Sequence, residues 1–201
     1  MFVHELSRYI VTRILNMRIF ALWLLLTTLT VWTSSGPFTQ WPLYSLSCAL
    51  FILGFRLWDD LSDLRYDREQ YPDRLLVQTE RFAYFYATLW TVVAVLTWLV
   101  FVTLGADRAL IFLAIIAAFW VLYRLNDFHP LSRSARGALV PVKYPLFILL
   151  LATDPGSLFS IMAGTGIYIA AVLDEMKDNG VSVLWAALPL TGAIIGVWMM
   201  L

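Results

Sequence analysis

Carboxylates gather where one apolar segment of the chain ends. Asp59, Asp60, Asp63 and Asp67 lie in the stretch DDLSDLRYDREQYPDR, directly after LSCALFILGFRLW. If a helix continues past Trp58, then Asp60, Asp63 and Asp67 stand at i, i+3 and i+7 and form one stripe. Acidic side chains stacked in this way repel one another, and each is costly at bilayer depth. The spacing therefore predicts a cation that compensates them.

A second acidic cluster, LDEMKDNG, ends another apolar run. Asp174 and Asp178 stand there at i, i+4, with Glu175 beside them. Carboxylate oxygens suit Mg²⁺, which completes its shell with water and phosphate oxygens. Two acidic stripes that face each other across a bundle could hold Mg²⁺ ions around a diphosphate. The plainer alternative is that both runs are solvated helix ends that stop the membrane spans.

The composition indicates which kind of protein carries these clusters. The chain has 201 residues, of which 61% are hydrophobic and 14% are charged, whereas soluble domains average about 25% charged residues. This predicts an integral membrane protein with an all-α fold, a polytopic helix bundle. The net charge is zero, so nothing favours nucleic acid as a partner. Membrane lipid is the expected surrounding.

The expected domain organisation is simple. Residues 1–18 are amphipathic and predict a helix at the membrane interface, and residues 19–201 form a single transmembrane domain. Pro141, Pro145 and Pro189 are expected to kink their helices. Seven apolar segments predict about seven spans: Ile19–Thr33, Pro42–Trp58, Phe82–Leu104, Ala109–Tyr123, Ala138–Ala152, Leu158–Leu173 and Val181–Leu201.

The connections between these segments alternate in charge. Arginine and lysine concentrate in the N-terminal stretch and in every second connection. The positive-inside rule then places the N-terminus and both acidic clusters in the cytoplasm and the C-terminus outside. Both acidic clusters are thereby expected at one face of the membrane, with Asp60 and Asp174 facing each other across one cavity.

The acidic stretch resembles the first aspartate motif of the UbiA superfamily of intramembrane prenyltransferases. That motif runs N/D-D-x-x-D-x-x-x-D and is followed by P-x-R. The second cluster resembles the family's D-x-x-x-D form, and the stretch from Tyr123 to Arg136, with HPLSR inside it, is similar to the loop that usually lies between the motifs. The residues that match the first motif are Asp59, Asp60, Asp63, Asp67, Pro72 and Arg74.

The resemblance implies a UbiA-like bundle in which Mg²⁺ on two acidic helices holds a prenyl diphosphate. A prenyl group would move to a hydrophobic acceptor, aromatic or lipid, in a bacterial or archaeal cell membrane. The implied catalytic residues are Asp60, Asp63, Asp67, Asp174 and Asp178, and the metal ligands are the same residues with Asp59. The diphosphate would be bound by Arg56, Arg74, Arg133, Lys143 and Tyr123. Tyr66, Tyr123 and Tyr144 could stabilise an allylic cation.

Two of these basic residues have a structural alternative. Lys143 stands mid-segment in VPVKYPLF, where a lysine either faces the cavity or pairs with an aspartate of the bundle. Arg56 either contacts the diphosphate or neutralises Asp59 or Asp60.

The chain also departs from the family pattern. Members usually have nine spans, Arg56 stands where an asparagine is common, and no third acid follows Asp178. Two other functions therefore stay open. One is a UbiA-type terpene cyclase, and the other is a non-catalytic membrane protein that keeps a degenerate prenyl-diphosphate site. A homo-oligomer or a partner subunit is compatible with either.

Overall fold

The computed structural model describes residues 2–34, 36–128 and 132–179, and their side chains except those of residues 2, 126–128, 133–134 and 174–179. Regular structure in this part of the chain is entirely helical, which confirms the all-α prediction for it. The last expected span, Val181–Leu201 with Pro189, lies outside the described residues.

Four helices are long and apolar enough to cross a membrane. They are α2 (Met17–Ser34), α3 (Trp41–Ser62), α6 (Phe82–Leu104) and α7 (Ala106–Phe128), and a 3-10 turn, η2 (Phe38–Gln40), leads into α3. Each contains one of the first four expected segments, because a long apolar run has no polar residue at which to stop. A shorter apolar stretch, Leu158–Leu173, begins α10 (Leu158–Asn179). The chain is thus an α-helical bundle of the membrane type.

The fifth expected segment is a broken helix. It consists of α8 (Arg133–Leu139), a 3-10 turn η3 (Val140–Val142) and α9 (Lys143–Leu151). Pro141 lies in the turn, where its missing N–H and its ring prevent an α-helix from continuing. At about 1.5 Å per residue, α9 is about 14 Å long, well short of the ~30 Å hydrocarbon core. The expected kink at Pro141 is confirmed.

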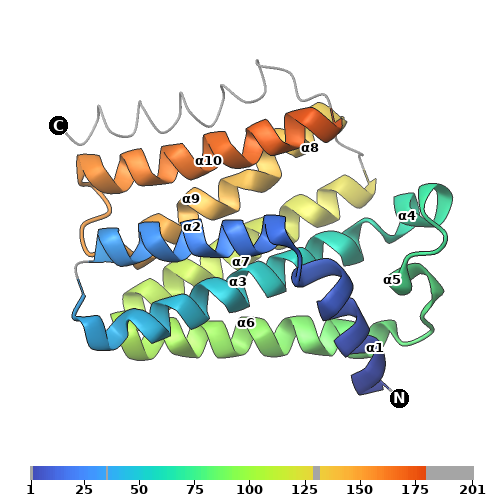
Figure 1. Cartoon of the computed structure of the whole chain (residues 1–201), viewed down its shortest axis with the longest axis horizontal. Helices are drawn as coiled ribbons and strands as arrows, with labels where there is room; N and C mark the ends of the chain where they lie inside the picture. Colours follow the sequence, from blue (N-terminus) through green and yellow to red (C-terminus); the bar gives the residue numbers. More distant parts are fainter. Residues whose placement is uncertain (1, 35, 129–131, 180–201) are drawn as a thin grey trace.

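The long helices lie side by side and alternate in direction (Figure 1). Helix α3 packs between α2 and α6, and α9 packs against α2, α7 and α10. Aromatic rings join these helices in the interior: Phe51 stacks on Phe147 with ring centroids 4.0 Å apart, and Phe55 meets Phe119 edge to face at 5.3 Å. This packing fixes the end of α3, where the acidic stretch begins, relative to α7 and α9.

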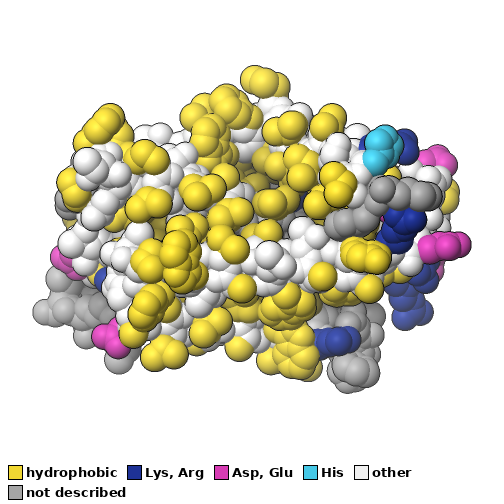
Figure 2. Space-filling model, turned by 90° about the horizontal axis from the view of Figure 1, so that it is seen from below, with side chains coloured by type: hydrophobic (Ala, Val, Ile, Leu, Met, Phe, Trp, Pro, Cys, Tyr) yellow, Lys and Arg dark blue, Asp and Glu magenta, His cyan; other side chains and the backbone are white. Residues whose placement is uncertain are grey.

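The surface also fits a membrane. Figure 2 shows apolar side chains across the middle of one face and most of the charged side chains at one end. Large apolar residues are exposed along the long helices, among them Trp98 at 60% and Leu110 at 64%. Apolar surface of this extent is rare on soluble monomers.

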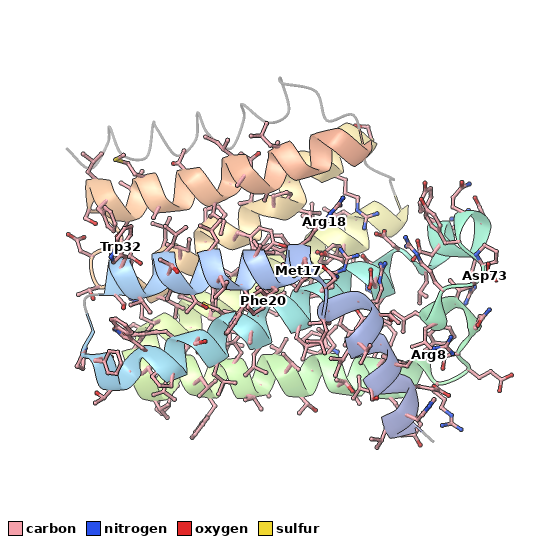
Figure 3. All side chains as sticks on the ribbon, in the orientation of Figure 1. Arg8, Met17, Arg18, Phe20, Trp32 and Asp73 are labelled. Atoms are coloured by element: carbon pink, nitrogen blue, oxygen red, sulfur yellow. The ribbon has the colours of Figure 1, made fainter. Side chains whose placement is uncertain are left out.

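The short helices gather at the charged end. Helix α1 (Phe2–Tyr9) continues as a π-helix, η1 (Ile10–Ile14), and two short helices, α4 (Leu64–Gln70) and α5 (Leu75–Gln78), follow α3. These elements and the C-terminal end of α10 all lie at the same end of the bundle (Figure 1). Figure 3 places Arg8 and Asp73 at this end and Trp32 at the opposite one. Both acidic stretches therefore lie at one end of the bundle.

Candidate functional site

The acidic stripe bends once, at Asp63. Helix α3 ends at Ser62, and Asp63 has φ −92° and ψ 0° before α4 begins at Leu64. The backbone N–H of Asp63 donates to the carbonyl of Asp59 at 3.0 Å, and the N–H of Asp67 donates to that of Asp63 at 2.8 Å. These i→i+4 hydrogen bonds keep the backbone helical through the bend, so the four aspartates lie along one continuous helical path.

Asp59 is held by two groups from distant helices. Lys143 Nζ lies 2.5 Å from Asp59 Oδ2, and the Tyr123 hydroxyl donates to Asp59 Oδ1. The lysine is 2% exposed, and its ammonium lies 5.2 Å from the ring centroid of Phe55 and 5.5 Å from that of Tyr144. Of the two roles expected for Lys143, the structure shows pairing with an aspartate.

Asp60 is held mainly from the N-terminus. Arg13 donates from Nη2 to Oδ1 at 2.7 Å and from Nε to Oδ2 at 3.1 Å, and the Tyr9 hydroxyl donates to Oδ2 at 2.9 Å. Arg56, one turn earlier on α3, lies 3.6 Å from Oδ1, so it neutralises this aspartate. Burial and the adjacent Asp60 carboxylate raise the pKa of the Tyr9 hydroxyl, which therefore stays a donor.

Asp63 and Asp67 each contact one basic side chain among the described residues. Arg136 of α8 pairs with Asp63, and Arg74 Nη1 lies 2.5 Å from Asp67 Oδ1. The Arg74 guanidinium also stacks on Tyr71, with Cζ 4.0 Å from the ring centroid. Burial raises the pKa of the Asp63 carboxyl, and the charges of Asp59 and Asp67 add to this, so that Arg136 compensates it only in part.

These contacts correct the electrostatic argument for a metal. The repulsion within the stripe does call for cations, but basic side chains from four helical elements and from the connection between α4 and α5 supply them in the described structure. They are Arg13, Arg56, Arg74, Arg136 and Lys143. Among the residues whose side chains are described, no group of three metal-binding side chains converges. The need for charge compensation therefore does not by itself imply Mg²⁺.

The donor set nevertheless suits a divalent cation. Carboxylate oxygens are the ligands that Mg²⁺ prefers, and the raised pKa of Asp63 means that this position favours added positive charge. The backbone of Asp174 and Asp178 lies in the last turns of α10, at the same end of the bundle (Figure 1). Their side chains, and that of Arg133, lie outside the described residues, so the expected meeting of Asp60 and Asp174 stays a prediction.

Three residues of the cluster were not expected from the sequence: Tyr9, Arg13 and Arg136. Tyr9 and Arg13 belong to the N-terminal amphipathic segment, and their spacing of four residues on its buried side was the available signal. Arg136 lies three residues beyond the expected Arg133, on the same short helix. Tyr66, by contrast, is 39% exposed and meets the ring of Tyr71.

Comparison with protein-family models, with curated proteins and with solved structures gives no match for this chain. The likeness to intramembrane prenyltransferases therefore depends on the motif residues of the sequence alone.

Proposed function

We propose that this chain is a Mg²⁺-dependent intramembrane prenyltransferase of the UbiA type. It would transfer a prenyl group from a prenyl diphosphate to a hydrophobic acceptor, aromatic or lipid, in a cell membrane. One observation carries the proposal: a stripe of aspartates, interleaved with arginines and a lysine, lies at the same end of an apolar helical bundle as the acidic end of α10. The N-terminus and this end would face the cytoplasm.

The described side chains suggest a division of roles. Mg²⁺ would be held by Asp60, Asp63 and Asp67 together with Asp174 and Asp178, and it would stabilise the charge that grows on the leaving diphosphate. Arg74 pairs with Asp67 and Arg136 with Asp63 in the structure, and both arginines would bind the diphosphate oxygens once a cation holds the carboxylates. Arg74 immediately precedes α5 and Arg136 belongs to α8, and a phosphate group can reach both from water at the bundle end.

The buried part of the cluster has another role. Asp59, Lys143 and Tyr123 join α3, α7 and α9, and the rings of Phe55 and Trp58 pack directly below them with centroids 5.7 Å apart. This arrangement holds the bundle end in place. The rings of Phe55 and Trp58 also line the bundle end with aromatic faces. These faces would exclude water and stabilise an allylic cation when the C–O bond of the prenyl diphosphate breaks.

A second candidate function is favoured by the same contacts. Each described aspartate of the stripe has a basic partner. The negative charges of the cluster are therefore balanced without a metal. A non-catalytic membrane protein that binds a prenyl diphosphate, alone or as a partner subunit, would need no more than this.

Release of diphosphate separates these functions. Purified protein is supplied with prenyl diphosphates of several chain lengths, Mg²⁺ and a membrane lipid extract. For a prenyltransferase, wild type releases diphosphate, Asp63→Ala does not, and the exposed Asp73→Ala keeps most of the activity as the matched control. Release without any acceptor, with a cyclised hydrocarbon as product, would identify a cyclase. No release at any chain length, together with binding of a prenyl thiodiphosphate, would identify the non-catalytic protein.

A further inference from the structure

The N-terminal segment occupies the carboxylate that the proposed function assigns to a metal. Both oxygens of Asp60 accept hydrogen bonds from Tyr9 or Arg13. We propose that these two residues form a latch, so that docking of the N-terminal helix and binding of a divalent cation at Asp60 exclude each other. This inference rests on the proposed function and adds to it a control built into the chain.

The geometry of the segment serves this contact. Tyr9 is the last residue of α1, and Arg13 belongs to the π-helix η1, whose wide turn is closed by the Leu15 N–H on the Ile10 carbonyl at 2.9 Å. π-Helical turns are rare in proteins, and those that occur often lie at functional sites. The wide turn places residues four apart on one side of the helix, and both side chains thereby reach the same carboxylate.

A cation and the latch cannot share Asp60. Mg²⁺ binds carboxylate oxygens at about 2.0–2.1 Å, whereas the guanidinium nitrogens already lie 2.7 and 3.1 Å from these oxygens. Two positive groups at such distances repel strongly. Arginine cannot escape by losing its proton, because its pKa lies far above neutral pH. The guanidinium must therefore leave before the metal arrives.

Apart from Asp60, the segment is held to the bundle by Leu6, Ile10 and Ile14, which are partly buried against the core, and by contacts of Glu5 and Tyr9. Glu5 accepts a hydrogen bond from Thr79 at 3.0 Å and lies 3.8 Å from Arg81, and Tyr9 meets Phe85 edge to face at 5.9 Å. On the other side Val3, Val11 and Leu15 are exposed by 76%, 58% and 70%. These apolar residues suit the lipid interface, so the segment keeps a membrane anchor when Asp60 releases it.

Binding of Mn²⁺, measured by electron paramagnetic resonance in detergent without substrate, tests the latch. Arg13→Gln should tighten Mn²⁺ binding at least about tenfold, the size of one charge-assisted hydrogen bond. Tyr9→Phe, which keeps the ring against Phe85, should tighten it less. Arg8→Gln removes an exposed arginine from α1, in the same N-terminal segment, and is the matched control. It should change the affinity by less than about twofold.

Hydrogen exchange supplies the second readout. Added Mg²⁺ should speed amide exchange in residues 2–16 of wild type, while in Arg13→Gln this segment should exchange fast from the start. Equal Mn²⁺ affinity in wild type, Arg13→Gln and Tyr9→Phe would overturn the latch and leave the metal site standing. Slower amide exchange of residues 2–16 in wild type after Mg²⁺ is added would also overturn the latch. Absence of Mn²⁺ binding in all variants would overturn the metal site, and the latch with it.

Discussion

Lys143 and Asp59 are 84 residues apart in the sequence, yet their side chains meet at 2.5 Å in the interior of the bundle. Removing one partner leaves a buried charge without its counter-charge, which costs about 3–5 kcal/mol. Lys143→Met and Asp59→Asn should therefore each lower the melting temperature in detergent, and the double variant should recover most of the loss. A double variant that loses the sum of both effects would show that the two residues do not act as a pair.

The burial of Asp63 predicts a pH dependence of stability. Because its pKa is raised in the folded state, the folded protein binds this proton more tightly than the unfolded chain does. The contribution of this carboxyl to the free energy of unfolding therefore falls as the pH rises above its ordinary pKa of 3.8. The melting temperature of wild type minus that of Asp63→Asn should fall between pH 4 and the raised pKa.

Asp73→Asn is the matched control for this titration, because Asp73 is exposed and lies outside the cluster. A melting temperature of wild type that rises relative to that of Asp63→Asn as the pH increases would contradict the prediction. It would mean that Arg136 more than compensates the burial of Asp63.

The Arg74 contacts predict a local effect. Arg74 pairs with the buried Asp67 and stacks on Tyr71, and it thereby joins α4 to the start of α5. Arg74→Gln should leave Asp67 without its counter-charge and speed amide exchange in residues 64–78, with little change in α6 and α7. Arg65→Gln, which replaces an exposed arginine of α4, should leave exchange as in wild type. A uniform increase along the whole chain would contradict this local role.

The contact of α9 with α10 depends on a glycine. A Cβ on Gly164 would lie 3.3 Å from Pro145 Cβ, whereas one on Gly166 would meet nothing within 4 Å. Alanine stabilises a helix interior by roughly 0.5–1 kcal/mol relative to glycine. Gly166→Ala should therefore raise the melting temperature, and Gly164→Ala should raise it less or lower it. Equal gains would show that α9 and α10 pack less closely than described.

Cysteine labelling tests the orientation in the membrane. In a Cys48→Ser background, a membrane-impermeant maleimide should label Gly156→Cys in intact cells, since the connection between α9 and α10 is expected outside. Asp73→Cys should react only after the cells are permeabilised. The reverse pattern would invert the topology, and labelling of both in intact cells would contradict a spanning bundle.

The sequence predicted the long helices well because one local property decides them. An apolar run of some twenty residues has few alternatives to a helix in lipid, and the segment Phe82–Leu104 has the same bounds in the structure. In the fifth segment the kink at Pro141 was expected, but the 3-10 turn at Val140–Val142 and the helical start at Arg133, ahead of the expected Ala138, were not. Apolarity alone does not show where a helix with a proline starts again.

The partners of the aspartates were harder to predict than the aspartates. The stripe follows from spacing within one helix, whereas Arg13 reaches Asp60 across 47 residues and Arg136 reaches Asp63 from α8. Such pairs depend on how the helices pack, and no local pattern records them. The sequence argument was therefore right that the acids need cations, and it considered Arg56 and Lys143 as partners, but it missed Arg13 and Arg136.

The order in which these partners are synthesised has a consequence for biogenesis. Arg13 precedes Asp60 and can neutralise it as soon as α3 forms, but Lys143 follows Asp59 by 84 residues. At roughly 5–20 residues per second, the ribosome needs about 4–17 s to reach it. During this interval the nascent chain carries Asp59 without its ammonium partner. The end of α3 must then stay at the membrane surface, and it settles into the bundle only when α9 arrives.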